Sequence, residues 1–342
     1  MPKRVSNRFI EELRDAVTGR AAELVAGVLV IQLAFVFSYV GAFHRPTPHH
    51  VPVQVVAPPR LAVAETQALN ALAGGPLKAT AATDQGAALR RLRENATDAV
   101  LVLEPRSRAD TLYVAGGGGA ALVTAVQDVL GRVEAAQRRG LRTVDAVPAQ
   151  SGDARGLSGF YLVVGWLIGG YLAASLLAIS HGSRPANQRR AVIRLLALAL
   201  YAVISGVGGA LIVGPLLGAL TGHVLALWWV GALLVFAAAA VTMALQVLVG
   251  VVGIGLTVVL FVVLGNPSAG GAYPAPLLPG FWRAISSWLP NGAGVEVVRR
   301  IVYFGGHGIG GALVVIAGYA LVGTLLALAV TRIRLFSRPT AA

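Results

Sequence analysis

The chain has 342 residues, of which 56% are hydrophobic and only 13% are charged. Soluble domains carry about a quarter of charged residues, so this composition excludes an ordinary water-soluble protein and indicates a membrane protein. The absence of cysteine excludes disulfide frameworks, cysteine-ligated metal sites and thiol catalysis, while the formal charge of +13 is interpreted as a topology signal and not as affinity for nucleic acid.

The N-terminal segment, residues 1–20, is predicted to form an amphipathic helix on the cytoplasmic surface of the membrane. Phe9, Ile10, Leu13 and Val17 recur at helical spacing and form one apolar face, while the charged side chains lie mostly on the other faces. A helix of this kind lies along the interface and does not cross the bilayer.

Apolar stretches that can cross a bilayer need about 20 residues each. The first runs over 21–43 and is expected to be an uncleaved anchor. The later stretches lie at 158–180, 193–220, 225–265 and 309–330. The run at 225–265 is too long for one crossing, so we divide it into two helices with a tight turn near 246–253.

The prediction is therefore an α-helical integral membrane protein with six transmembrane helices, one before and five after an inserted extracytoplasmic α/β domain. The five-helix block would cover 158–332, and a cytoplasmic tail would follow at 333–342.

The inserted segment 44–157 has ordinary soluble composition and alternates short strands with helices, which predicts a small α/β domain. One helix is expected to end at Gly74, and a second to begin after an N-cap at Asp84. The uninterrupted apolar run 99–103 is typical of a central strand buried on both faces. Further strands are expected at 51–55, 111–115 and 143–147, and a longer helix at 122–133.

Two motifs in this domain suggest ligands but favour a structural interpretation. Gly116–Gly119 formally fits a dinucleotide fingerprint, yet no acidic ribose contact follows at a suitable distance, so a glycine turn before a helix is favoured. His49 and His50 are adjacent and would point to opposite faces of a strand, so a metal site is not expected. No cofactor is predicted.

Positive charge fixes the expected orientation, because Lys and Arg are retained on the cytoplasmic side of short loops. Both termini are basic, and the segment after the second span carries four arginines and no acid: Arg184, Arg189, Arg190 and Arg194. With six spans all three basic segments fall on one side. Both termini are therefore expected in the cytoplasm and residues 44–157 outside.

Small residues on the third span predict close helix packing. The stripe consists of Gly206, Ala210, Gly214 and Gly218, which are four residues apart. It fits packing within the chain, or a seam between two copies of the chain. Pro215 lacks a backbone donor and is expected to kink this span.

The membrane block lacks the groups that chemistry would need. After Asp153 the only acidic residue is Glu296, and the chain has no P-loop motif. We therefore expect neither an enzyme nor an ion-coupled transporter with a buried carboxylate, and ATP hydrolysis would have to belong to a partner.

Before the last span, the segment 277–306 combines aromatic residues, a proline and two arginines. The named candidates for an outer gate or interface are Phe281, Trp282, Trp288, Pro290, Arg299 and Arg300. Simple anchoring at the headgroup level is one interpretation. The other is a re-entrant helical pair whose arginines attract anionic lipid or substrate groups.

The motifs NPSAGGAY at 266–273, LLPGFWRAISSWLPNGA at 277–293 and VVRRIVYFGG at 297–306, with this architecture, resemble the membrane subunits of type-2 ABC exporters. Within that group the chain is most similar to the phage-infection-protein-like branch. The resemblance implies a homo- or heterodimeric permease in the bacterial cytoplasmic membrane, which moves a hydrophobic or amphiphilic substrate outward.

The resemblance also implies that the N-terminal surface helix and the four arginines of 184–194 contact a separate ATPase. The same arginines are explained by the positive-inside rule without any partner. Some members of this branch are not known to work with an ATPase. The rival hypothesis is therefore a membrane scaffold or receptor, tied to a secretion system or to another envelope partner.

Overall fold

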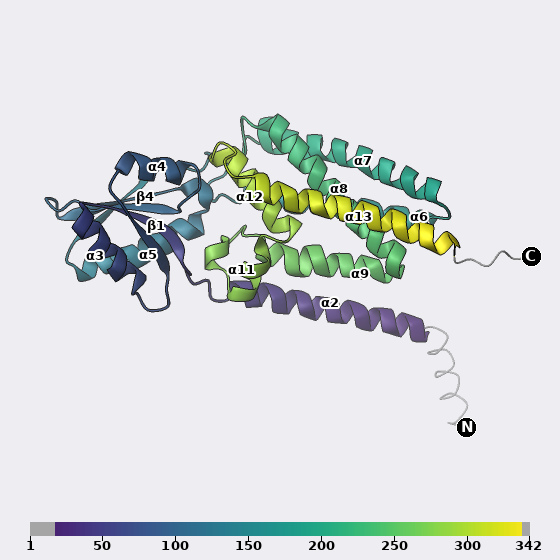
Figure 1. The fold of residues 1–342 in the computed structure, drawn as a ribbon. Helices are drawn as coiled ribbons and strands as arrows, with labels where there is room; N and C mark the ends of the chain where they lie inside the picture. Colours follow the sequence, from purple (N-terminus) through teal and green to yellow (C-terminus); the bar gives the residue numbers. More distant parts are fainter. Residues whose placement is uncertain (1–17, 337–342) are drawn as a thin grey trace, which may run out of the picture.

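The computed structural model describes residues 18–336, and Figure 1 shows an α/β domain at one end of a bundle of long helices. Five of these helices are long and apolar enough to cross a membrane, which agrees with a helical membrane protein. They are α2 (Gly19–Phe43), α6 (Ser158–His181), α7 (Gln188–Leu211) with its extension to Leu216, α8 (Val224–Val249) and α13 (Gly310–Phe336). The predicted surface helix at 1–20 falls almost wholly outside the described residues.

The span predicted between 253 and 265 is a shorter apolar helix over Val252–Ser268. It consists of α9 (Val252–Val258), a π-helical stretch (Val259–Gly265) and α10 (Asn266–Ser268). Gly250 ends α8 with a φ of +71°, a conformation that suits glycine, so the helix breaks inside the predicted turn. Within residues 18–336 there are thus five long apolar helices and one shorter one, where six long ones were predicted.

The extension of α7 contains Pro215, the residue that was predicted to kink this span. The α-helix ends at Leu211 and continues as a π-helical turn over Ile212–Leu216 that contains Pro215. Proline cannot donate to the carbonyl four residues earlier, so the regular hydrogen-bond ladder is interrupted at this point.

The α/β domain contains one five-stranded sheet in the order β2-β1-β3-β4-β5. All neighbouring strands are parallel except β3 and β4, which are antiparallel. The strands are β1 (Val51–Val56), β2 (Leu77–Ala82), β3 (Ala99–Val102), β4 (Ala109–Val114) and β5 (Gly140–Asp145). The sequence interpretation missed β2, an edge strand with few large apolar residues, and placed β5 three residues too late.

Two layers of helices cover the sheet. The helices α3 (Pro59–Asn70) and α5 (Ala120–Ala136) pack on one face, with Leu101 and Leu112 in the core between them. The helix α4 (Gln85–Arg93) packs on the other face beside Val100, and its predicted N-cap, Asp84, accepts a hydrogen bond from the Gly86 amide at 2.8 Å. Val100 and Leu101 are both fully buried, as the apolar run predicts for a central strand.

Two short helices connect the domain with the bundle: α11 (Gly280–Ser286) and α12 (Pro290–Tyr303). Phe304, at the end of α12, is buried against the α4 face of the sheet. In Figure 1, α2 lies beside α9 along one edge of the bundle, and α11 lies at the end of this pair that is nearer to the α/β domain. The helices α6, α7 and α13 surround α8, which is the most buried of the long helices.

Candidate functional site

The junction between the α/β domain and the bundle brings together most of the residues predicted for an outer gate. Trp282 of α11 donates a hydrogen bond through its indole N–H to Ser38 Oγ of α2 at 3.1 Å. Its ring also lies where a side chain on Gly41 would stand. Phe281 and Trp288 remain exposed, which suits aromatic residues at a membrane interface. The helix α11 is therefore held against the C-terminal part of α2.

A proline explains why Ser38 is needed there. Pro267 carries no N–H, so the carbonyl of Val263 four residues earlier lacks its α-helical donor. Ser38 Oγ, only 3% exposed, donates to that carbonyl at 2.5 Å. One hydroxyl thus joins α2, the π-helical stretch and α11.

A second buried polar group lies at the start of α12, next to the predicted Pro290. Asn291 is fully buried and donates through Nδ2 to the Phe261 carbonyl at 2.9 Å and to Asn266 Oδ1 at 2.8 Å. A side chain on Gly265 would overlap the Asn291 amide, so glycine is required for this approach. The Asn291 amide thus joins α12 to the π-helical stretch and to α10 by hydrogen bonds.

The glycine turn at Gly116–Gly119 is where the α/β domain contacts the end of α12 and Pro274. A side chain on Gly117 would overlap the ring of Tyr303, and Gly119 adopts a φ of +121° beside Pro274. The Tyr303 hydroxyl donates to Asp153 Oδ2 at 2.6 Å. The close approach of Tyr303 therefore explains Gly117, and the positive φ explains Gly119.

The two arginines of α12 are engaged within the chain. Arg299 donates to the Gly270 carbonyl at 3.0 Å, and Arg300 pairs with Glu296 at 2.9 Å and donates to the His307 carbonyl at 2.9 Å. Arg299 also lines a cavity of about 210 Å³ that includes Asp98 of the α/β domain. Burial raises the pKa of Asp98 to about 6, although the charges of Arg299 and Arg300 act in the opposite direction.

An apolar groove of about 430 Å³ runs between α8 and α13, with Trp288 at one end. On α13 it extends from Val314 to Leu326, which corresponds to about 18 Å of helix. Both ends of this stretch and Trp288 are exposed, so the groove opens on the side of the bundle. It can accept an apolar chain but offers almost no polar partner.

The arginines predicted to dock an ATPase lie at the other end of the bundle, in and after the α6–α7 turn (Figure 1). Arg184, Arg189 and Arg190 are exposed. Arg194 differs, because its guanidinium donates to the carbonyls of His181 and Gly182 at 2.9 Å and caps the end of α6.

The small residues of the third span split into two groups. A Cβ on Gly206 would lie 2.7 Å from the Ala232 nitrogen and the Trp228 oxygen, and Ala210 is fully buried, so both lie within the bundle, Gly206 against α8. Gly214 contacts Val224. Gly218 does not belong to the packing stripe: it lies beyond the helix with a φ of +64° and no atom near its Cβ position. Gly206 and Ala210 thus contribute to packing within the bundle itself.

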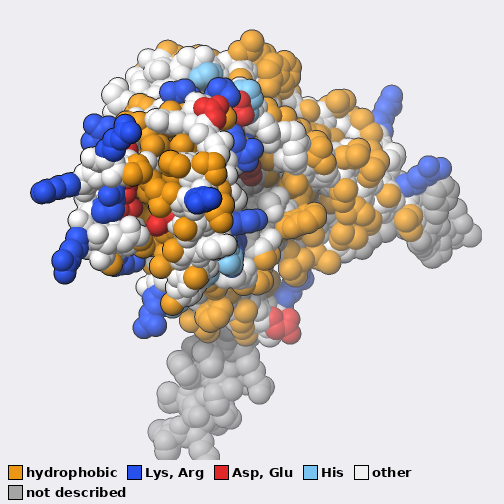
Figure 2. Space-filling model, turned by 60° about the vertical axis from the view of Figure 1, so that its left-hand side comes forward, with side chains coloured by type: hydrophobic (Ala, Val, Ile, Leu, Met, Phe, Trp, Pro, Cys, Tyr) orange, Lys and Arg blue, Asp and Glu red, His pale blue; other side chains and the backbone are white. Residues whose placement is uncertain are grey.

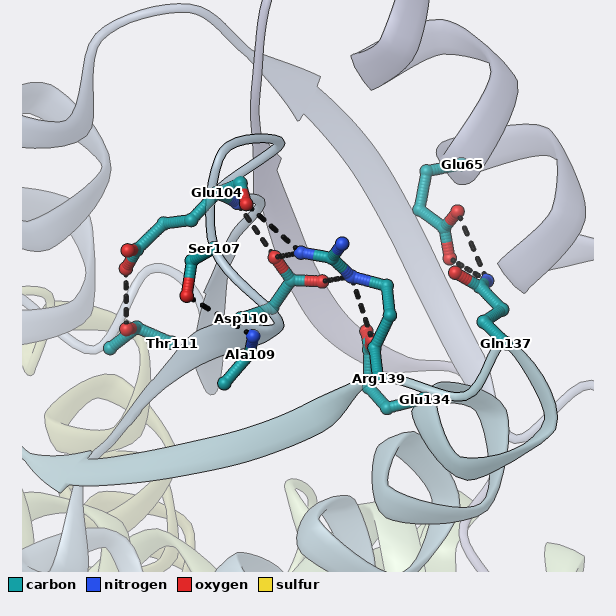
Figure 3. A network of polar contacts seen from close by, with 9 residues as sticks. All are labelled: Glu65, Glu104, Ser107, Ala109, Asp110, Thr111, Glu134, Gln137 and Arg139. Carbon is teal, nitrogen blue, oxygen red and sulfur yellow. Dashed lines mark hydrogen bonds and ion pairs between the residues drawn. The ribbon is translucent and has the colours of Figure 1, made fainter.

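A separate polar cluster lies at the C-terminal end of α5 in the α/β domain (Figure 3). The Arg139 guanidinium donates two hydrogen bonds, of 2.6 and 2.7 Å, to the Asp110 carboxylate, and its Nε lies 3.7 Å from Glu134 Oε2. The side chains of both acids are only 1% exposed. Burial and the neighbouring Asp110 charge raise the pKa of Glu134 to about 7. Burial would also raise the pKa of Asp110, but the Arg139 hydrogen bonds and the Glu104 amide hold it below its usual value.

Among residues 18–336, no three His, Asp or Glu side chains are grouped so that they could hold a metal ion. Comparisons with protein-family models, with curated proteins and with solved structures find no match for this chain.

Proposed function

We propose that the chain is the transmembrane subunit of an exporter that moves a hydrophobic or amphiphilic substrate outward and is powered by a separate ATPase. The observation that carries this proposal is the lateral apolar groove between α8 and α13. Amphiphilic molecules partition into the bilayer, and a groove on the side of a helical bundle can receive them directly from the hydrocarbon region.

The proposed topology has six crossings, with both termini in the cytoplasm and the α/β domain outside a bacterial cytoplasmic membrane. The α8 helix starts beside the α/β domain. Just before it, the Thr221 backbone N–H donates to Gln150 Oε1 of that domain at 2.7 Å. The α12 helix also lies beside that domain, so the chain must return between them. Val252–Ser268 supplies the return, and its length corresponds to about 25 Å of helix, near the lower limit for a span.

The test is affinity purification of the full chain from native membranes in a mild detergent, with mass spectrometry of the proteins that accompany it. A stoichiometric P-loop ATPase is the expected result, since the chain itself has no such motif. An envelope or secretion protein in place of an ATPase would overturn the exporter proposal.

The groove is tested in the same complex through ATP hydrolysis in lipid. Gly318 lines the groove and Gly311, on the same helix, does not, and neither has an atom near its Cβ position. We expect Gly318→Phe to change substrate-dependent ATP hydrolysis by filling the groove, while Gly311→Phe leaves it unchanged. Equal behaviour of the two variants would contradict a role for the groove.

ATPase docking is tested with the exposed arginines of the α6–α7 turn. Replacement of Arg184, Arg189 and Arg190 by Gln is expected to reduce the amount of ATPase that co-purifies about tenfold. The reason is that charges at the edge of an interface steer and orient the two partners. The matched control replaces three arginines of the α/β domain: Arg106, Arg108 and Arg132. Unchanged ATPase recovery in the first variant would refute the docking role.

A scaffold or receptor is the second candidate, and a surface of the α/β domain favours it. Figure 2 shows hydrophobic side chains gathered on the end of this domain, with Lys and Arg around them. A hollow of about 640 Å³ lies between Leu72–Pro76 and α5. Exposed apolar surface with a polar rim is typical of protein interfaces.

A further inference from the structure

A cleft of about 520 Å³ lies between α4 of the α/β domain and the loop that follows α12. Arg90 and Arg93 line one side, and His307 lines the other. The two arginines are three residues apart in the last turn of α4, so their side chains share one face of the helix. Residues from both halves of the molecule therefore build this cleft.

The arginines of the cleft carry charge that the chain itself does not neutralise. Within residues 18–336, neither guanidinium takes part in an ion pair or a side-chain hydrogen bond, and both residues are exposed. Glu94 is the only acidic residue in the lining. Arg299 and Arg300 contrast with them, because both are held by acceptors in the chain.

The position of the cleft relates it to the membrane. His307 precedes α13 by three residues, and its carbonyl accepts from Arg300, which fixes the loop. The apolar helix α13 begins at Gly310, so under the proposed topology the cleft lies at the depth of the outer headgroups. The half-buried Tyr303 adds aromatic surface to the lining, as is common at that depth.

We propose that this cleft binds the phosphate of an anionic phospholipid headgroup, with Arg90 and Arg93 as the phosphate ligands. Guanidinium groups match phosphate oxygens in geometry and charge, and two of them on one helix face can engage one phosphate. A lipid headgroup is favoured over a free phosphate compound because the cleft adjoins the start of a membrane helix. The inference requires the proposed orientation in the membrane, but it does not require transport.

The probe is phosphatidylglycerol, added to the purified full chain in detergent and followed by native mass spectrometry. An arginine near a membrane surface contributes about 1 kcal/mol to lipid binding, so Arg90→Gln together with Arg93→Gln is expected to weaken binding about 30-fold. The matched control, Arg106→Gln with Arg108→Gln, makes the same change of charge on the exposed turn between β3 and β4, which does not line the cleft. Gel filtration verifies that both variants remain folded.

Two further outcomes decide the proposal. Equal loss of phosphatidylglycerol in both variants would show that net charge alone attracts the lipid and would overturn the site. Inorganic phosphate that binds as tightly as the lipid and displaces it would overturn the lipid as the ligand. Weak competition by phosphate, and little binding of phosphatidylcholine, are expected. The presence or absence of an accompanying ATPase is a separate measurement and affects neither result.

Discussion

Buried polar side chains donate hydrogen bonds to backbone carbonyls of the irregular helix at the junction. Ser38 donates to the carbonyl that Pro267 leaves without its α-helical donor, and it accepts from Trp282. Asn291 donates to the Phe261 carbonyl of the π-helical stretch and to the Asn266 side chain. Polar groups without partners are costly in an apolar environment, so these residues permit irregular helix geometry at the junction.

Ser38→Ala is predicted to destabilise the protein by about 1–2 kcal/mol, because one buried acceptor and one buried donor lose their partner. The measurement is thermal unfolding of the detergent-purified chain. Ser180→Ala is the control, since the exposed Ser180 hydroxyl bonds only within its own helix. Equal midpoints for both variants would contradict the structural role of Ser38.

Glu134 is predicted to make stability depend on pH. Its folded-state pKa of about 7 lies above the ordinary value of 4.5, so the folded state binds the proton more tightly. The contribution of Glu134 to stability is complete below about pH 4.5 and is lost as the pH rises through about 7. Thermal unfolding between pH 5 and 8 is expected to show a smaller decline for Glu134→Gln than for Glu94→Gln, a control at an exposed acid. Parallel curves would refute the assignment.

At the scale of elements, glycines allow neighbouring elements to pack in close contact. Gly206 lets α7 approach α8, while Gly117 lets the α/β domain sit on Tyr303 of α12. Gly323 lets α13 approach α8 in the same manner. Small residues at such crossings are the usual means of packing helices in membranes.

Gly206→Ile is predicted to destabilise the bundle by about 1–3 kcal/mol or more, because the new side chain would collide with the α8 backbone. The control is Gly208→Ile on the same helix, where no atom lies near the Cβ position. The fraction of monodisperse protein after heating, measured by gel filtration, should fall for the first variant alone. A similar loss in both would point to helix propensity and not to packing.

At the scale of the whole molecule, the α/β domain and the α6–α7 turn lie at opposite ends of the bundle (Figure 1). The exposed arginines of that turn, at positions 184, 189 and 190, carry no acid beside them. Retention of such charges in the cytoplasm would leave the α/β domain outside. The distribution of charge along the long axis of the molecule thus supports the proposed orientation.

The chain contains no cysteine, which permits a direct test of this orientation. A cysteine in place of Arg106, exposed in the α/β domain, should react with a membrane-impermeant thiol reagent in intact cells. A cysteine in place of Ala186, exposed in the α6–α7 turn, should react only after the cells are opened. The reverse pattern would invert the proposed topology.

The sequence by itself determined the membrane character, most of the long apolar helices, the inserted α/β domain and its central strand, because apolar length and periodicity are local properties. It missed β2, whose pairing is set by its neighbour β1. Only the tertiary structure decided that Trp282 fastens to α2, that Arg299 and Arg300 are engaged, and that Gly218 serves a turn. Ser38 and Val263 are 225 residues apart, and no local pattern encodes a hydrogen bond that depends on how distant helices pack.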